Sequence, residues 1–118
     1  MAIERLHVEK RFSEIAISGN LVHLAGQLAS DLSLDIKGQT QQTLDIIDHF
    51  LADAGTDKSH IMSVIIFVKD IEQDYSGMNE VWDAWCSDIQ ALPRTCVEAK
   101  MYRPDVLVEM TVVAVKPE

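Results

Sequence analysis

The stretch PRTCVEAKMYRPDVLVEMTVVAV, residues 93–115, decides the fold because it contains two predicted strands joined by a turn. Side chains of alternating character over residues 94–101 indicate an extended chain with two different faces. Residues 103–105, Arg-Pro-Asp, are typical of a turn, because proline fixes φ and aspartate bonds nearby backbone. Residues 106–115 form the longest apolar run and predict a second strand. The rest of the chain can be interpreted as a scaffold for this pair.

Two charged residues in these strands stand out. Arg94 shares its strand face with Cys96 and Glu98, and Glu109 interrupts the apolar run of the second strand. A lone carboxylate in such a run is costly to bury unless it is paired or protonated. Arg94 and Glu109 are therefore candidates for chemistry. The alternative is a structural ion pair between the two strands, and the residues alone favour neither interpretation.

Length and composition predict one soluble domain spanning residues 1–118, with 47% hydrophobic and 25% charged residues. The formal net charge of −9 disfavours nucleic acid as a partner, because affinity for phosphates comes mostly from Lys and Arg. No apolar run resembles a signal peptide or a membrane span, so we expect a cytoplasmic protein that does not act on membranes. Cys86 and Cys96 have no metal or redox spacing and are expected to be reduced thiols.

The N-terminal part predicts three strands. Residues 3–8 indicate a short edge strand, and a Gly-Asn pair between residues 13–18 and residues 21–26 indicates a hairpin. Gly26 ends the third strand, where a glycine lets another group approach the backbone closely.

Two later segments have apolar residues at helical spacing. Residues 36–54 predict the first helix, with Gly55 as its C-terminal stop, and residues 71–89 predict the second. Between them, residues 60–69 are apolar on both faces, which is typical of a buried, parallel central strand.

Both helices carry residues that allow a second interpretation. One set lies on the outer face of the first helix: Asp45, Asp48, His49 and Asp53. A divalent ion could bind at this spacing, but a solvated acidic face is the more common arrangement, so we predict no metal site. Trp82 and Trp85 of the second helix could stack on a ligand, but a stripe at helical period is more often core.

The predicted order is three strands, a helix, a strand, a helix and two strands. Both helices then connect strands of one sheet, and right-handed crossovers place them on the same face. The other face keeps apolar side chains without cover. We therefore expect another subunit to bury it in an obligate oligomer.

Several motifs together resemble the YjgF/RidA (Rid) family, whose members are also labelled L-PSP endoribonuclease-like. The most specific are Pro93-Arg94-Thr95-Cys96-Val97-Glu98, Arg103-Pro104-Asp105-Val106 and Val108-Glu109-Met110. Weaker matches are Ser18-Gly19-Asn20-Leu21-Val22, Ala25-Gly26-Gln27, Ala54-Gly55, Val68-Lys69-Asp70 and Met78-Asn79. The resemblance extends over nearly the whole chain.

The resemblance implies an α+β, chorismate-mutase-like (Rid) fold, with a mixed six-stranded sheet and two helices packed on one face. It implies a homotrimer with active sites in the clefts between subunits. The implied reaction is hydrolytic deamination of reactive 2-imino and enamine acids to 2-keto acids and ammonia, without a cofactor. The implied partners are a small 2-imino or 2-keto carboxylate and further copies of the chain.

The resemblance also implies roles for individual residues. Arg94 would hold the substrate carboxylate with two parallel hydrogen bonds, which a lysine could not match. Glu109 would hold a water molecule and pass protons. The substrate pocket would further be lined by Phe12, Gly26, Asn79 and Cys96.

Position 12 departs from the best-known members, which carry a tyrosine there. Phe12 keeps the ring but loses the hydroxyl. This supports an alternative function, a non-catalytic trimeric binding or regulatory module that holds small carboxylate metabolites in the inter-subunit cleft. The retained Glu109 favours the enzyme. A ribonuclease activity is disfavoured by the acidic charge.

Overall fold

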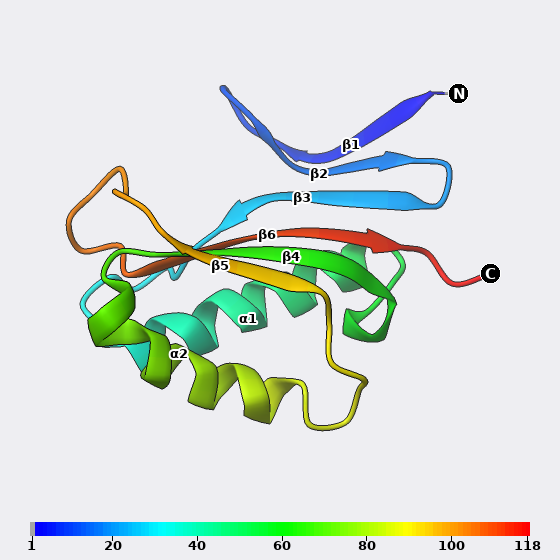
Figure 1. Cartoon of the computed structure of the whole chain (residues 1–118). Helices are drawn as coiled ribbons and strands as arrows, with labels where there is room; N and C mark the ends of the chain where they lie inside the picture. The colour runs from blue at the N-terminus through cyan, green and yellow to red at the C-terminus, as the bar shows by residue number, and fades with distance from the viewer. Residues whose placement is uncertain (1) are drawn as a thin grey trace.

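The computed structural model describes residues 2–118, which form one layer of strands and one layer of helices (Figure 1). The strands are β1 (Ile3–Val8), β2 (Ser13–Ser18), β3 (Leu21–Gln27), β4 (Ile61–Val68), β5 (Arg94–Glu98) and β6 (Val108–Val115). The helices are α1 (Ile36–Asp53) and α2 (Ile71–Trp85), and a short 3-10 helix, η1 (Lys58–His60), precedes β4. The predicted order of strands and helices is confirmed.

All six strands belong to one sheet in the order β1-β2-β3-β6-β4-β5. Only β4 and β5 pair in parallel, and every other neighbouring pair is antiparallel. Both helices pack on the same face of this sheet (Figure 1). The predicted α+β class, with a mixed six-stranded sheet and two helices on one face, is confirmed.

The hairpin between β2 and β3 has the predicted two-residue loop, because Ser18 and Leu21 are paired across it. Gly19 in the loop has a φ of 63°, a conformation that glycine adopts without steric cost. Further along β3, the pairing with β6 shifts between Leu24 and Gln27. This bulge lies at Gly26, where a close approach was predicted.

The hydrophobic core lies between the sheet and the helices. Alternate residues of β6, from Val108 to Ala114, are buried there, and so are Val64, Ile66 and Val68 of β4. Trp82 and Trp85 are only 6% and 8% exposed, so their interpretation as core residues is confirmed.

The helix-free face of the sheet carries the side chains between these buried ones. Cα partners in a sheet project to the same face, so Thr111 of β6 lies beside Ile65 of β4. Ile65 and Val97 are 42% and 40% exposed, and Leu21 is 37% exposed. The predicted apolar, uncovered sheet face is therefore present in the single chain.

Both strands of residues 93–115 are shorter than predicted. β5 ends at Glu98 and β6 begins at Val108, because both residues pair with Val68, the last residue of β4. Gln39, which is fully buried in α1, holds the intervening loop instead. It accepts a hydrogen bond from the Leu107 amide (3.0 Å) and donates one to a loop carbonyl (2.8 Å).

The second helix also ends earlier than predicted, at Trp85 instead of residue 89. Lys58 donates a hydrogen bond from Nζ to the Trp85 carbonyl oxygen at 2.6 Å. This bond satisfies one of the free carbonyl groups at the helix end. The chain then turns, and the Ile89 amide donates to the Cys86 carbonyl at 3.2 Å.

Candidate functional site

Arg94 begins β5 and lies on the helix-covered face, because its Cα partner on β4 is the buried Val64. Its side chain reaches α2. There, Nη2 donates hydrogen bonds to Asn79 Oδ1 at 2.7 Å and to Tyr75 Oη at 3.2 Å. Nη1 lies 3.9 Å from the sulfur of Met78. Two turns of α2 thus fix the orientation of the guanidinium.

All groups that hold the Arg94 guanidinium are neutral. Its Cζ lies 5.3 Å from the centroid of the Trp82 ring and 5.8 Å from that of Tyr75. Among residues 2–118, no Asp or Glu forms an ion pair with Arg94. Aromatic faces stabilise a cation without neutralising it. The charge of Arg94 is therefore available to an anionic ligand, and its planar fork suits a carboxylate.

The other residues on this side divide into expected and unexpected ones. Asn79 was predicted near the site and contacts Arg94. Tyr75 was missed, although it lies four residues before Asn79 and therefore on the same face of α2. Cys96 shares the face of Arg94 and packs against the core, and burial raises the pKa of its thiol. We call Arg94, Tyr75, Asn79 and Cys96 the clamp half-site.

Glu109 lies on the opposite, helix-free face, because its Cα partner on β4 is Phe67 and its neighbours Val108 and Met110 point into the core. Its side chain is half-buried and makes no hydrogen bond or ion pair with another side chain within residues 2–118. Burial raises the pKa of the Glu109 carboxyl above its ordinary value. A carboxyl of this kind exchanges protons closer to neutral pH.

Gly26 is the residue that the Glu109 carboxyl approaches. A Cβ atom at position 26 would stand 2.2 Å from Glu109 Oε2, which is far inside van der Waals contact. The close approach predicted at this glycine is confirmed, and the approaching group is the Glu109 carboxyl.

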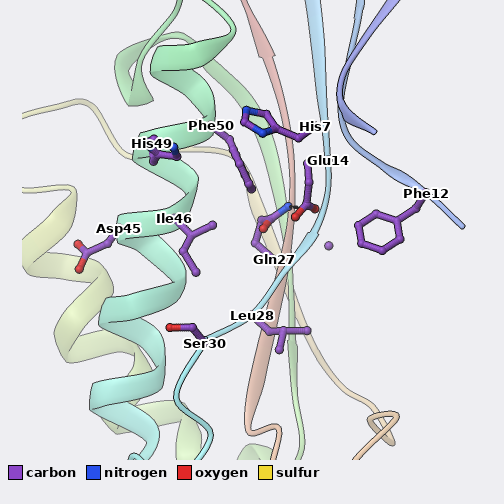
Figure 2. A pocket seen from close by; sticks show the side chains of 11 residues that line it. His7, Phe12, Glu14, Gln27, Leu28, Ser30, Asp45, Ile46, His49 and Phe50 are labelled. Carbon is purple, nitrogen blue, oxygen red and sulfur yellow. Dashed lines mark hydrogen bonds between the residues drawn. The ribbon is translucent and has the colours of Figure 1, made fainter. Parts of the chain in front are cut away.

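Phe12 lies beside a cavity of about 600 Å³ that Gly26 also lines (Figure 2). Phe12 is 52% exposed. The strand side of this cavity includes Glu14, whose Oε1 accepts a hydrogen bond from Gln27 Nε2 at 3.1 Å. Residues of α1, among them Phe50, line the other side. Glu109 does not line this cavity. We call Glu109 and Gly26 the carboxyl half-site, and Phe12 lies by the cavity, outside this half-site.

The acidic outer face of α1 is engaged in hydrogen bonds. Asp48 accepts a hydrogen bond from Trp85 Nε1 at 3.0 Å. Asp53 Oδ2 lies 2.8 Å from His7 Nε2 and 3.5 Å from His49 Nε2. Over residues 2–118, no group of three or more His, Cys, Asp or Glu side chains is arranged to hold a metal ion.

Arg94 and Glu109 leave the sheet on opposite faces, and β4 lies between their strands. The alternative interpretation of these two residues as a strand-to-strand ion pair is therefore wrong within a single chain, residues 2–118. The predicted site residues that are in direct contact are Arg94 with Asn79, and Glu109 with Gly26. Within one chain the clamp half-site and the carboxyl half-site stay apart.

Comparisons with known proteins agree with this fold. The family model described as endoribonuclease L-PSP matches residues 2–116. A RutC family protein of Haemophilus ducreyi is 40% identical over 112 residues, which cover 95% of each chain. The 2-iminobutanoate/2-iminopropanoate deaminase of Escherichia coli is 28% identical over 105 residues, covering 83% of this chain and 81% of the enzyme.

A crystal structure points the same way. A member of the YjgF protein family from Neisseria meningitidis is 36% identical, with a TM-score of 0.95 over 100% of this chain and 98% of that one. Within the described part of the chain, neither helix has the length and apolar character needed to cross a membrane.

The family model covers residues 2–116, and the Haemophilus ducreyi relative is 40% identical over 95% of the chain. The chain therefore belongs to the endoribonuclease L-PSP family, also called the YjgF/RidA family, as the motif around Arg94 predicted.

Proposed function

We propose that the protein hydrolyses reactive 2-imino and enamine acids to 2-keto acids and ammonia. The observation that carries this proposal is the Arg94 guanidinium, which neutral groups hold in place and which no carboxylate of residues 2–118 neutralises. A 2-imino acid has a planar carboxylate, and a guanidinium binds it with two parallel hydrogen bonds. Membership in a family that includes a deaminase 28% identical to this chain supports the reaction class.

Glu109 is the proposed proton carrier. In imine hydrolysis, the oxygen of water bonds to the imine carbon while the nitrogen gains a proton. The resulting carbinolamine then breaks its C–N bond, so that one water is consumed and one ammonia is released. The raised pKa of Glu109 suits a group that accepts a proton from water and returns it to the leaving nitrogen.

The two half-sites require a second copy of the chain. A small 2-imino acid cannot reach Arg94 and Glu109 of one chain, because the sheet separates them. We propose a homotrimer in which the β5 edge of one copy, with Arg94, meets the helix-free face of the next copy, with Glu109. A head-to-tail contact repeated three times closes a ring. The exposed apolar side chains of Ile65 and Val97 on that face favour burial in such a contact.

A coupled assay tests the reaction. The purified protein is added to a serine or threonine dehydratase, and the release of 2-keto acid is followed. Wild type is expected to accelerate release, and Arg94→Ala is expected to leave it at the rate without added protein. Arg103→Ala is the matched control, because Arg103 is an exposed arginine that is paired with Asp105 at 2.8 Å. A wild-type rate equal to the rate without added protein would refute the proposed reaction.

The binding module remains the second candidate, because Phe12 offers an exposed ring without a hydroxyl. In this function, Arg94 holds a small carboxylate metabolite without turnover. Calorimetry with 2-oxobutanoate distinguishes the two functions. Binding that depends on Arg94, together with no acceleration in the dehydratase assay, would establish the module in place of the enzyme.

A further inference from the structure

We propose that Tyr75 is a further ligand-binding residue. Its hydroxyl oxygen accepts a hydrogen bond from Arg94 in the free protein, and its O–H donates a hydrogen bond to the carboxylate of the ligand once the ligand has displaced it from Arg94. This inference rests on the proposed carboxylate clamp. The carrying observation is that both Tyr75 Oη and Asn79 Oδ1 accept hydrogen bonds from the same nitrogen, Nη2 of Arg94.

The shape of a guanidinium makes this shared nitrogen important. A carboxylate can bind two parallel N–H groups either at Nη1 and Nη2 or at Nε and Nη2, so both arrangements use Nη2. Nη2 of Arg94 carries two hydrogens and already has two acceptors. A ligand that binds with both oxygens must therefore displace one of these acceptors.

Tyr75 is the acceptor that we expect the ligand carboxylate to displace from Nη2. Its bond to Arg94 is 3.2 Å long, whereas the bond to Asn79 is 2.7 Å long. Tyr75 is also 42% exposed, whereas Asn79 is half-buried, so the tyrosine stands on the side from which a ligand arrives. Asn79 and the Trp82 ring keep the guanidinium in place during the exchange.

The displaced hydroxyl remains useful to the ligand. A phenol both accepts and donates hydrogen bonds, so the O–H that is released from Arg94 lies next to the incoming carboxylate and can donate to it. The site would then hold the carboxylate by two N–H groups and one O–H group. Phe12 cannot supply such a hydroxyl, and Tyr75 supplies it from α2. The ligand class is a small 2-oxo or 2-imino acid with an ionised carboxylate.

Calorimetry with 2-oxobutanoate on the assembled protein tests the role of the hydroxyl. Tyr75→Phe is expected to weaken binding roughly tenfold, the lower end for a hydrogen bond to a charged group. In an Arg94→Lys background, which keeps measurable affinity, Tyr75→Phe is expected to cause a smaller loss than in wild type, because the two residues bind the same carboxylate. The control is Tyr102→Phe, which removes the hydroxyl of a 72% exposed tyrosine in the loop before β6 and should bind like wild type.

The outcomes separate this inference from the proposed function. If Arg94→Ala loses binding and Tyr75→Phe binds like wild type, the role of Tyr75 is refuted and the clamp stands. If Arg94→Ala binds like wild type, the clamp itself is refuted, and the role of Tyr75 with it. A Tyr75→Phe protein with a lower thermal midpoint or a smaller mass in solution would show a structural role and also refute the inference.

Discussion

The two faces of the sheet hold their charged groups in contrasting ways. On the helix-covered face, Arg94 is oriented by two hydrogen bonds and two aromatic rings. On the helix-free face, Glu109 lies against the bare backbone of Gly26 with a raised pKa. The Arg94 guanidinium is thus held by neutral groups, whereas partial burial keeps the Glu109 carboxyl protonated to higher pH than an exposed glutamate. In a structural ion pair each member neutralises the other, and within residues 2–118 of one chain Arg94 and Glu109 do not neutralise each other.

The contrast predicts that Glu109→Gln has the largest effect on turnover. The amide cannot take or give the proton, so the rate in the dehydratase assay should fall by about 10²- to 10⁴-fold. Binding of 2-oxobutanoate should stay close to wild type, because the substitution is nearly isosteric and leaves the clamp half-site unchanged. Glu4→Gln, on the exposed edge strand β1, is the control. A Glu109→Gln protein with the wild-type rate would mean that Glu109 does not carry the proton.

A charge on the helix-free face should have the next largest effect. Ile65→Asp places a carboxylate among the side chains that the proposed trimer buries, which costs several kcal/mol when it is unpaired. Obligate oligomers often lack a stable folded monomer, so this variant should unfold, not merely dissociate. Light scattering and circular dichroism report mass and folding, with Tyr102→Asp as an exposed control. Wild type that is a stable monomer in solution would contradict the trimer.

On the helix-covered face, Arg94→Lys should have a moderate effect that appears in binding. Lysine keeps the positive charge but cannot make two parallel hydrogen bonds. The affinity for 2-oxobutanoate, measured by calorimetry, should fall by about 1–3 kcal/mol. Arg103→Lys should bind like wild type, because Arg103 lies at the surface with Asp105. Equal affinity of Arg94→Lys and wild type would show that a point charge suffices.

The smallest effect concerns the pH dependence of stability that the half-buried Glu109 carboxyl causes. The folded-state pKa of Glu109 is raised, so the folded protein keeps this proton to higher pH than the unfolded chain does. The resulting stabilisation is complete below the unfolded pKa of about 4.3 and is lost as pH rises through the folded pKa. Asp74 is only 4% exposed, and burial raises its pKa as well. Asp74 therefore also makes the free energy of unfolding decrease as pH rises.

Denaturant unfolding across this pH range measures the slope. Glu109→Gln should show a flatter dependence of the free energy of unfolding on pH than wild type, and Asp74→Asn should remove the part due to Asp74. Identical slopes in wild type and Glu109→Gln would indicate that the pKa of Glu109 is the same in the folded and unfolded chains.

Most of the fold could be predicted because its signals are local. The alternation of buried and exposed residues in β6, and the apolar stripes of α1 and α2, can each be read from a short, continuous stretch of sequence. The boundaries that were wrong depend on contacts between distant residues. Gln39 holds the loop before β6, and Lys58 holds the end of α2, and neither contact has a sequence signature.

The site was predicted in part for a similar reason. Glu109 and Gly26 interrupt the strand patterns and could be recognised as exceptions. Tyr75 could not, because it fits the apolar stripe of α2 like a core residue. The faces of Arg94 and Glu109 depend on how β5 and β6 each pair with β4, which a single sequence does not specify.

Mixed assemblies test most directly whether each site combines Arg94 of one copy with Glu109 of another. Arg94→Ala and Glu109→Gln chains with different tags are co-expressed, assemblies containing both are isolated, and keto-acid release is compared with each variant alone. In a trimeric ring that contains both variants, one site in three, or about a third of the sites, would unite an intact Arg94 with an intact Glu109. We predict that activity returns to about that fraction of the wild-type rate. Activity that stays at the level of the separate variants would contradict a site shared between two copies.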